Sequence, residues 1–164
     1  MKRFVGLLGL AIIFSCCATA YKKIGWKGGY SETQLGENIF QVSFRGNGYT
    51  SEERASDFNL LRSAELSLEN GFRYFIIVES DKSSSLSTYT TPVTSHTRVH
   101  VNVSGNYATG SATTYSDGGQ TYLISKPRAA NTILCFKEKP EVSVIIFDAE
   151  FVKKSIRQKY GLFK

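Results

Sequence analysis

The sequence predicts an α+β fold, a mainly antiparallel sheet with two helices packed on it, preceded by a lipoprotein signal peptide. Three observations predict it. Apolar and polar residues alternate in several short segments, such as residues 39–44, which indicates strands with one buried face. Two longer segments, residues 51–70 and 148–161, carry apolar residues at helical spacing. The chain has 164 residues, 41% of them hydrophobic, which suits a single domain with a buried core.

The first residues have the composition of an export signal. Residues 1–3 (MKR) are positively charged, and residues 4–14 (FVGLLGLAIIF) are apolar and uncharged. As a helix this apolar segment would span about 17 Å, well short of the roughly 30 Å hydrocarbon core of a bilayer. A signal peptide is therefore favoured over a membrane-spanning helix. We predict a signal peptide at residues 1–16, a flexible tether at 17–29 and a single α+β domain at 30–164.

Two cysteines follow the apolar segment and are candidates for lipid attachment. Residues 13–16 (IFSC) resemble the lipobox, in which a peptidase cuts just before a cysteine that receives lipid. The small Ser15 before Cys16 favours Cys16 over Cys17 as the lipidated residue. The alternative is cleavage after residues 18–20 (ATA), which would release a soluble protein. We expect the lipidated form, because cysteine is uncommon at this place in ordinary signal peptides.

Lipidation determines the expected location and partners. Several acyl chains, each contributing about 0.8 kcal/mol per buried CH₂, anchor a protein firmly. An aspartate after the cysteine would resemble the inner-membrane retention signal of lipoproteins, and neither cysteine is followed by one, which points to the outer membrane. We expect the periplasmic face of a Gram-negative bacterium, with the cell surface as the open alternative. Removal of two cations with the signal lowers the net charge from +6 to +4. The expected partners are the membrane, through the anchor, and an envelope protein; export removes nucleic acid as a partner.

The first half of the domain is predicted to contain two strands and a helix. A strand over 38–44 is followed by a turn at 45–48 and a helix over 51–70. Thr50 and Glu53 have the spacing of a capping box at its start, and Asn70 and Gly71 end it. The acidic residues of this helix are expected to serve as caps or lie in solvent: Glu52, Glu53, Asp57, Glu65 and Glu69. A strand over 72–78 follows, so the three elements could form a right-handed parallel crossover.

The second half begins with a Ser/Thr-rich segment, residues 80–97, which is expected to be a long exposed loop or a loosely formed hairpin arm. Segments 98–104, 107–115 and 122–125 suggest an antiparallel meander with one wet face. Segments 133–136 and 142–147 suggest a hairpin. A final helix is expected to be capped by Asp148 and ended by Gly161.

Few residues suggest chemistry. His96 and His100 would face the same way on a strand about 13 Å apart, too far to share a metal ion, and are expected to be ordinary surface residues. Cys135 lies among apolar residues and is expected to be a buried, inert thiol. The Gly46-Asn47-Gly48 segment lacks the pattern of a phosphate-binding loop and is expected to be a turn. The sequence predicts no metal site and no cofactor.

Two further features are candidates for contact with a partner or a membrane. The C-terminal helix carries a basic surface that could face an acidic protein or anionic headgroups, formed by Lys153, Lys154, Arg157 and Lys159. Trp26, in the tether, could dip into the lipid interface, but packing against the domain is the expectation.

Residues 28–78, beginning GGYSETQLGENIFQVSFRGNGYT, resemble a family of small proteobacterial outer-membrane lipoproteins. The resemblance resumes at residues 126–140 and 147–161 and so covers most of the domain. It implies an envelope location and brings no catalytic residues. In this family the lipidated cysteine is usually followed by Ala and then Ser or Thr, which resembles Cys17-Ala18-Thr19 and favours Cys17.

The sequence therefore predicts a lipid-anchored cell-envelope protein with a non-enzymatic binding, structural or assembly role. Two alternatives remain open. The first is a periplasmic carrier or sensor of a small ligand with an aromatic pocket. The second is a hydrolase that uses Cys135 as its nucleophile.

Overall fold

The computed structural model describes residues 17–162, so the predicted signal peptide and Cys16 lie outside the described residues. The chain divides into two compact units. The first contains the described residues up to Ser85 and those from Ser125 onward, and we call it the body. The second, Leu86–Ile124, is called the hairpin arm.

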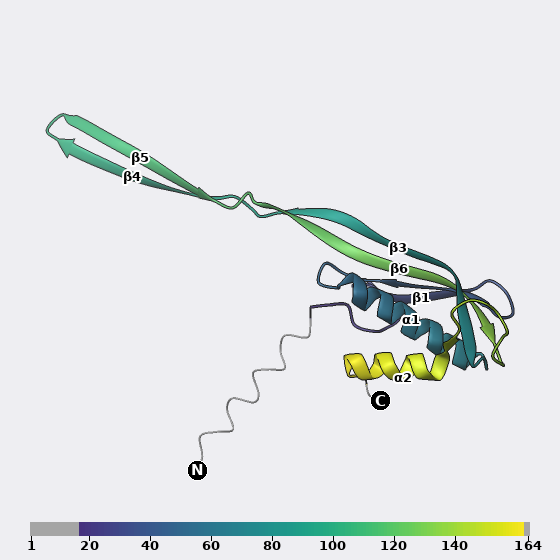
Figure 1. The fold of residues 1–164 in the computed structure, drawn as a ribbon. Coiled ribbons are helices and arrows are strands. Elements are labelled where there is room, and N and C mark those ends of the chain that lie inside the picture. Colours follow the sequence, from purple (N-terminus) through teal and green to yellow (C-terminus); the bar gives the residue numbers. More distant parts are fainter. Residues whose placement is uncertain (1–16, 163–164) are drawn as a thin grey trace, which may run out of the picture. The chain divides into compact units, whose positions relative to one another are not determined.

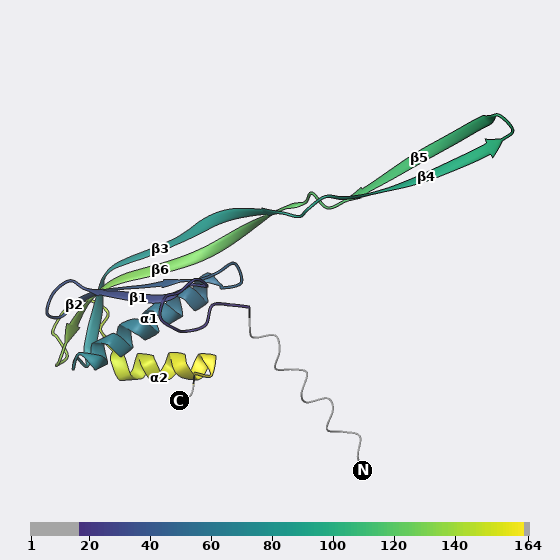
Figure 2. The same cartoon turned by 180° about the vertical axis from the view of Figure 1, so that it is seen from behind.

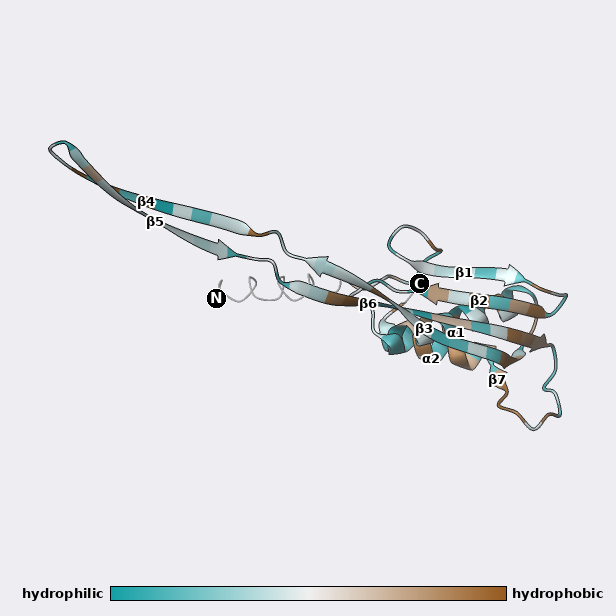
Figure 3. Cartoon of the chain, turned by 90° about the horizontal axis from the view of Figure 1, so that it is seen from above, coloured by the Kyte–Doolittle hydropathy of each residue, from teal (hydrophilic) through white to brown (hydrophobic). Residues whose placement is uncertain are grey.

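The body is a sheet covered by helices on one face (Figure 1 and Figure 2). Its five strands have the order β1-β2-β6-β3-β7, which Figure 3 shows from above. Their bounds are Gly29–Gln34 (β1), Ile39–Arg45 (β2), Tyr74–Thr90 (β3), Thr121–Phe136 (β6) and Phe147–Asp148 (β7). The helices are α1 (Glu52–Glu69) and α2 (Ala149–Tyr160). The predicted α+β fold with two helices on an antiparallel sheet is confirmed.

The strands on either side of α1 do not touch each other, because β6 lies between β2 and β3. β2 pairs antiparallel with β6. The hydroxyl of Ser80 donates to Asn131 at 2.9 Å, and that of Thr132 lies 3.5 Å from Glu79, so β3 and β6 also run in opposite directions. The predicted parallel crossover is therefore a split one, with β6 inserted between its two strands.

Both helices begin and end at specific capping residues. Ser51, not Thr50, is the N-cap of α1 and accepts a hydrogen bond from the Arg54 amide at 3.1 Å, which corrects the predicted capping box. Asn70 ends this helix, as predicted. The predicted cap of α2 is confirmed, since Asp148 accepts from two backbone amides of its first turn. Gly161 ends α2 with a φ of +64°.

The core lies between the sheet and α1, and α1 also packs on α2. Its largest fully buried apolar side chains come from both layers: Phe44, Phe58, Phe75, Leu61, Ile133 and Val42. Because α1 is covered on two sides, it also buries polar residues. One of these, Asn59, is 0% exposed, and neither polar atom of its side chain has a partner among the described residues.

Of the predicted meander, the antiparallel pairing of segments 98–104 and 107–115 is confirmed, but segment 122–125 does not join it. β4 (Thr94–Ser104) and β5 (Tyr107–Asp117) pair only with each other, in a separate two-stranded sheet within the hairpin arm. The predicted hairpin of segments 133–136 and 142–147 is also wrong. β6 is already flanked by β2 and β3, so it has no free edge, and β7 pairs instead with β3.

Candidate functional site

The segment that follows Cys17 is held against the body. The Asn47 side chain donates to the carbonyl oxygen of Cys17 at 2.7 Å, and the Asn47 amide donates to the Thr19 hydroxyl at 2.9 Å. The Thr19 amide donates in turn to the Thr50 hydroxyl at 3.0 Å, and Thr19 is 2% exposed. The prediction of a flexible tether at residues 17–29 is therefore wrong. The Gly46-Asn47-Gly48 turn holds Cys17 at a defined place on the body.

The same segment presents Trp26 at the tip of a tight turn. The backbones of Gly25 and Gly28 exchange two hydrogen bonds, at 3.1 and 3.0 Å, so Trp26 and Lys27 occupy the two central positions. The relative exposure of Trp26 is 104%. The expected packing of Trp26 on the domain is wrong, because the turn directs this side chain away from the body.

The turn lies so close to its neighbours that two glycines are required at its base. Gly28 has a φ of +94°, and a Cβ there would lie 2.2 Å from the carbonyl oxygen of Arg45. Gly29 has a φ of +131°, and a Cβ there would lie 2.5 Å from the carbonyl oxygen of Lys22. Any residue with a Cβ would be strained by the positive φ and would clash with the neighbouring carbonyl oxygen unless the backbone moved. The position of Trp26 is thus built into the fold.

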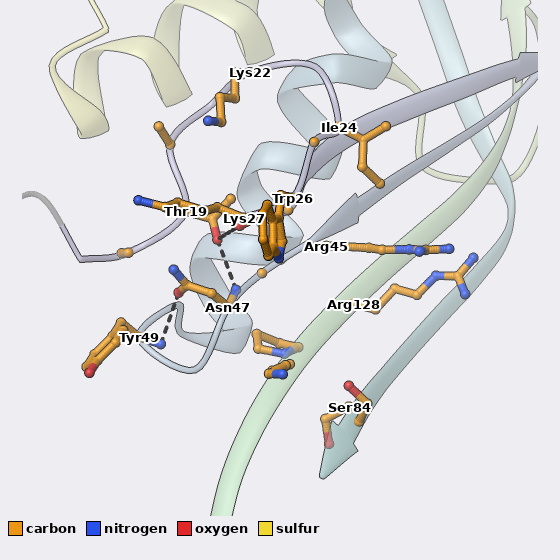
Figure 4. A pocket seen from close by; sticks show the side chains of 18 of the residues that line it. Thr19, Lys22, Ile24, Trp26, Lys27, Arg45, Asn47, Tyr49, Ser84 and Arg128 are labelled. Carbon is orange, nitrogen blue, oxygen red and sulfur yellow. Dashed lines mark hydrogen bonds between the residues drawn. The ribbon is translucent and has the colours of Figure 1, made fainter. Parts of the chain in front are cut away.

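Around this turn is an open hollow of about 1180 Å³ (Figure 4). Its lining contains Cys17, and no acidic residue is among the described residues that form it. Five cations line it, contributed by three separate segments of the body: Lys22, Lys27, Arg45, Lys126 and Arg128. Trp26 and Tyr49, which is 76% exposed, add aromatic surface. We call these residues the cationic hollow.

Two of these cations occupy directly opposite positions on neighbouring strands. Arg45 of β2 and Arg128 of β6 are register partners in the antiparallel ladder, so their side chains leave the same face of the sheet. Both residues are exposed, and Figure 4 shows their side chains extending in the same direction. Like charges at directly opposite positions destabilise a sheet. An adjoining small recess includes Arg128 and Lys82 and brings in one acidic residue, Glu52.

The predicted basic surface of α2 is only partly available. Arg157 forms an ion pair with Glu65 of α1 at 2.7 Å, and Lys159 forms one with Asp57 at 2.7 Å. The hydrogen bonds that Lys159 donates to Asp57 and Glu53 raise its pKa. Two of the four predicted cations are therefore occupied by the acids of α1. Lys154 is exposed and Lys153 is half-buried.

Cys135 is placed as its apolar neighbours predict, with 0% exposure. Its sulfur lies 3.2 Å from the hydroxyl of Ser67, and burial raises the pKa of the thiol. A buried, protonated thiol is a poor nucleophile, so the structure opposes the hydrolase alternative. His96 and His100 are exposed on β4, in the hairpin arm, whereas Cys135 belongs to the body.

The hairpin arm carries an exposed apolar surface. Val99, Val101 and Val103 lie on one face of β4, opposite Ala112, Gly110 and Ala108 of β5. The three valines are 60–72% exposed. At the base of the same face, hydroxyls pair across the strands at 2.9 Å, as in Ser95 with Ser116. Only two residues of the arm carry a full charge, Arg98 and Asp117.

The sequence does not reveal the cationic hollow, because the residues that form it lie far apart in the chain. The available signal was the run of residues 22–27 (KKIGWK) shortly after the cysteines, in which lysines flank the single tryptophan. Within residues 17–162, no cluster of three or more potential metal ligands is found. No helix in that range is both long and apolar enough to cross a bilayer.

Comparison of the chain with protein-family models, with curated proteins and with solved structures found no match.

Proposed function

We propose that this chain is a lipid-anchored cell-envelope protein that acts by binding a partner protein through the hairpin arm, without catalysing a reaction. The observation that carries the proposal is the apolar face formed by Val99, Val101 and Val103, which lies open to solvent. A two-stranded hairpin is at best marginally stable in water unless one of its faces is covered. The arm therefore has the properties of a binding surface whose apolar face is covered when a partner protein binds.

The chemistry of the arm indicates the kind of partner. The apolar face is narrow and made of small residues, so a flat segment of small apolar side chains would pack against it. The backbones at the outer edges of β4 and β5 are also free to pair, because these strands bind only each other among the described residues. We expect an extended, uncharged segment of another envelope protein that adds to the arm as a strand.

The membrane part of the proposal rests on the sequence and gains support from the geometry around Cys17. The apolar segment 4–14 and the lipobox-like residues 13–16 favour lipid attachment. A hydrogen bond from Asn47 holds Cys17 at the surface of the body, where a lipid attached to it could extend away from the protein. The small-ligand alternative gains no such support, because core aromatic rings such as Phe58 and Phe44 pack on one another, at 5.3 Å between centroids.

The proposal can be tested by crosslinking in living cells. A photoreactive amino acid is placed at Val101, on the apolar face, and in a second strain at His100, the adjacent residue on the polar face. We expect Val101 to give one adduct of defined mass with another envelope protein, and His100 to give much less of it. A Val101→Lys substitution, with the probe moved to Val99, should remove this adduct.

Two outcomes would contradict the proposal. Equal adducts from Val101 and His100, or none from Val101 in any growth condition, would show that the apolar face is not a binding surface. An adduct between two copies of the chain would show that the arm binds another copy of this protein and not a different partner.

The lipid anchor is tested separately, by labelling cells with a fatty acid in Cys16→Ala and Cys17→Ala strains. Label that persists in both strains would show that neither cysteine carries the lipid.

A further inference from the structure

We infer that the cationic hollow is a docking surface for anionic phospholipid headgroups. The body would then contact the membrane directly, in addition to its attachment through the lipid anchor. This inference goes beyond the proposed function and rests on it only for the lipid at Cys17. It is carried by four features of the body: the position of Cys17, the exposure of Trp26, the charge of the lining and the Arg45–Arg128 pair.

The position of Cys17 links the hollow to the anchor. Cys17 is itself part of the lining, and its carbonyl is bound by Asn47. An acyl group on a residue held in this way would bring the surrounding surface to the bilayer at a fixed distance. The cations that share a surface with Cys17 are those of the cationic hollow, whereas Arg157 and Lys159 of α2 are paired with acids of α1.

The charge of the lining matches an anionic surface. Its five cations are uncompensated by any acid among the described residues of the lining, and each basic residue near an anionic membrane contributes about 1 kcal/mol to binding. Arg45 and Arg128 repel one another across the ladder in the free protein. A headgroup phosphate between the two guanidinium groups would remove this repulsion, because arginine binds phosphate through paired hydrogen bonds.

The exposed Trp26 favours a membrane over a soluble anion as the binding partner of the hollow. A small phosphate ligand would need the cations alone, whereas tryptophan prefers the interface between headgroups and acyl chains, where its ring is apolar and its N–H remains hydrated. The turn made by Gly25 and Gly28 presents Trp26 and Lys27 together, so the ring and an ammonium group reach the same surface. Ile24, 38% exposed, adds apolar surface in the same lining.

Trp26 also provides the test, because the chain contains one tryptophan. The processed protein, purified from membranes, is reconstituted into vesicles of phosphatidylcholine alone or of phosphatidylcholine with phosphatidylglycerol. We expect Trp26 emission to shift to shorter wavelength and to be quenched by lipids brominated near the headgroup, in the anionic vesicles only. High salt should reverse both effects, since it screens the attraction of exposed charges.

Matched charge reversals locate the surface. Lys27→Glu combined with Arg128→Glu should abolish the blue shift and the quenching. Lys153→Glu combined with Lys154→Glu makes the same change of charge on α2 and should leave both intact. If the α2 variant loses the response and the first variant keeps it, the docking surface lies on α2 and the inference is wrong.

The remaining outcomes separate this inference from the proposed function. Protein that does not float with either kind of vesicle contradicts the lipid anchor. If the protein floats with anionic vesicles but the emission wavelength of Trp26 stays that of a tryptophan in water, the docking surface is contradicted and the lipid anchor is not. Protection of Trp26 from iodide by inorganic phosphate without vesicles, with no response to anionic vesicles, would make the hollow a site for a soluble anion and would also overturn the inference.

Discussion

Glu65 of α1 accepts two hydrogen bonds from the guanidinium group of Arg157 in α2, at 2.7 and 3.0 Å, across 92 positions of sequence. The Glu65 side chain is 9% exposed and also accepts a hydrogen bond from the Tyr21 hydroxyl. Burial and this carboxylate raise the pKa of Tyr21. The guanidinium group of Arg62 lies 3.7 Å from Glu65 and binds Glu32 and Glu69 at 2.9 and 2.8 Å. One buried carboxylate thus joins the N-terminal segment, α1 and α2.

Glu65→Gln is expected to destabilise the protein by about 3 kcal/mol, because it leaves the partly buried Arg157 without its counter-charge. Urea unfolding followed by circular dichroism measures the loss. Lys159→Gln provides the comparison, since it removes an ion pair with Glu53 and Asp57 that lies in solvent, and its effect should be much smaller. Equal effects of the two substitutions would contradict the special role of Glu65.

Asn59→Leu is expected to stabilise the protein by about 1 kcal/mol, because the side chain is fully buried and its amide has no partner among the described residues. The same substitution at Asn131 is the control. Asn131 is also buried, but its oxygen accepts a hydrogen bond from Ser80 at 2.9 Å, so its replacement should destabilise. Thermal unfolding of both variants measures the difference. A lower melting temperature for Asn59→Leu would indicate an unseen partner for the amide.

Cys135 is expected to resist alkylation in the folded protein and to react at once in denaturant, because it is buried and its pKa is raised. Mass spectrometry after a maleimide pulse measures the labelled fraction. A Cys135→Ala variant shows how much of the label belongs to this residue. Fast labelling under native conditions would reopen the hydrolase alternative.

Stability is expected to depend on pH through Asp148. Hydrogen bonds from Arg73, and from the amides of Phe151 and Glu150, lower the pKa of this carboxyl below its usual value of about 3.9. A carboxyl whose folded pKa is depressed contributes stability above its unfolded pKa, and this contribution is lost as the pH falls through the folded pKa.

The matched variant is Asp148→Asn, since asparagine caps a helix about as well but carries no charge. Wild type should be the more stable of the two at neutral pH, and the difference in unfolding free energy should shrink as the pH falls below the usual carboxyl pKa of about 3.9. Chemical unfolding at several pH values gives this difference. A difference that stays constant as the pH falls well below that value would show that the charge of Asp148 adds no stability.

Removal of the hairpin arm is expected to leave the body folded. All buried apolar residues that form the two core clusters lie outside residues 86–124. We expect a chain in which Asn-Gly joins Ser85 to Lys126 to keep its helical circular dichroism and to unfold cooperatively. A body that fails to fold without the arm would contradict the division into two units.

Local patterns in the sequence predicted the ends of helices well where these ends depend only on residues close by in the chain. Asp148 and Gly161 bound α2 as expected, and Asn70 ends α1, because a cap depends on neighbours within one turn. The N-cap of α1 was misplaced by one residue because Thr50 bonds to Thr19, a contact over 31 positions. Segments 98–104 and 107–115 pair as predicted, because a short turn joins them. The predicted pairings of segments 122–125 and 133–136 were wrong, because the pattern of a strand does not specify its partner.

By itself the sequence determined the α+β class and the burial of Cys135, because each depends on composition or on spacing along the chain. The export signal at residues 1–16 stays a prediction. Tertiary structure alone decided which charges are free. It placed Arg157 against Glu65 and Lys159 against Asp57, and it brought Arg45, Arg128 and Lys27 together beside Cys17. The physical reason is that a charge acts over distances of several ångströms in space, and folding sets these distances between residues far apart in the chain.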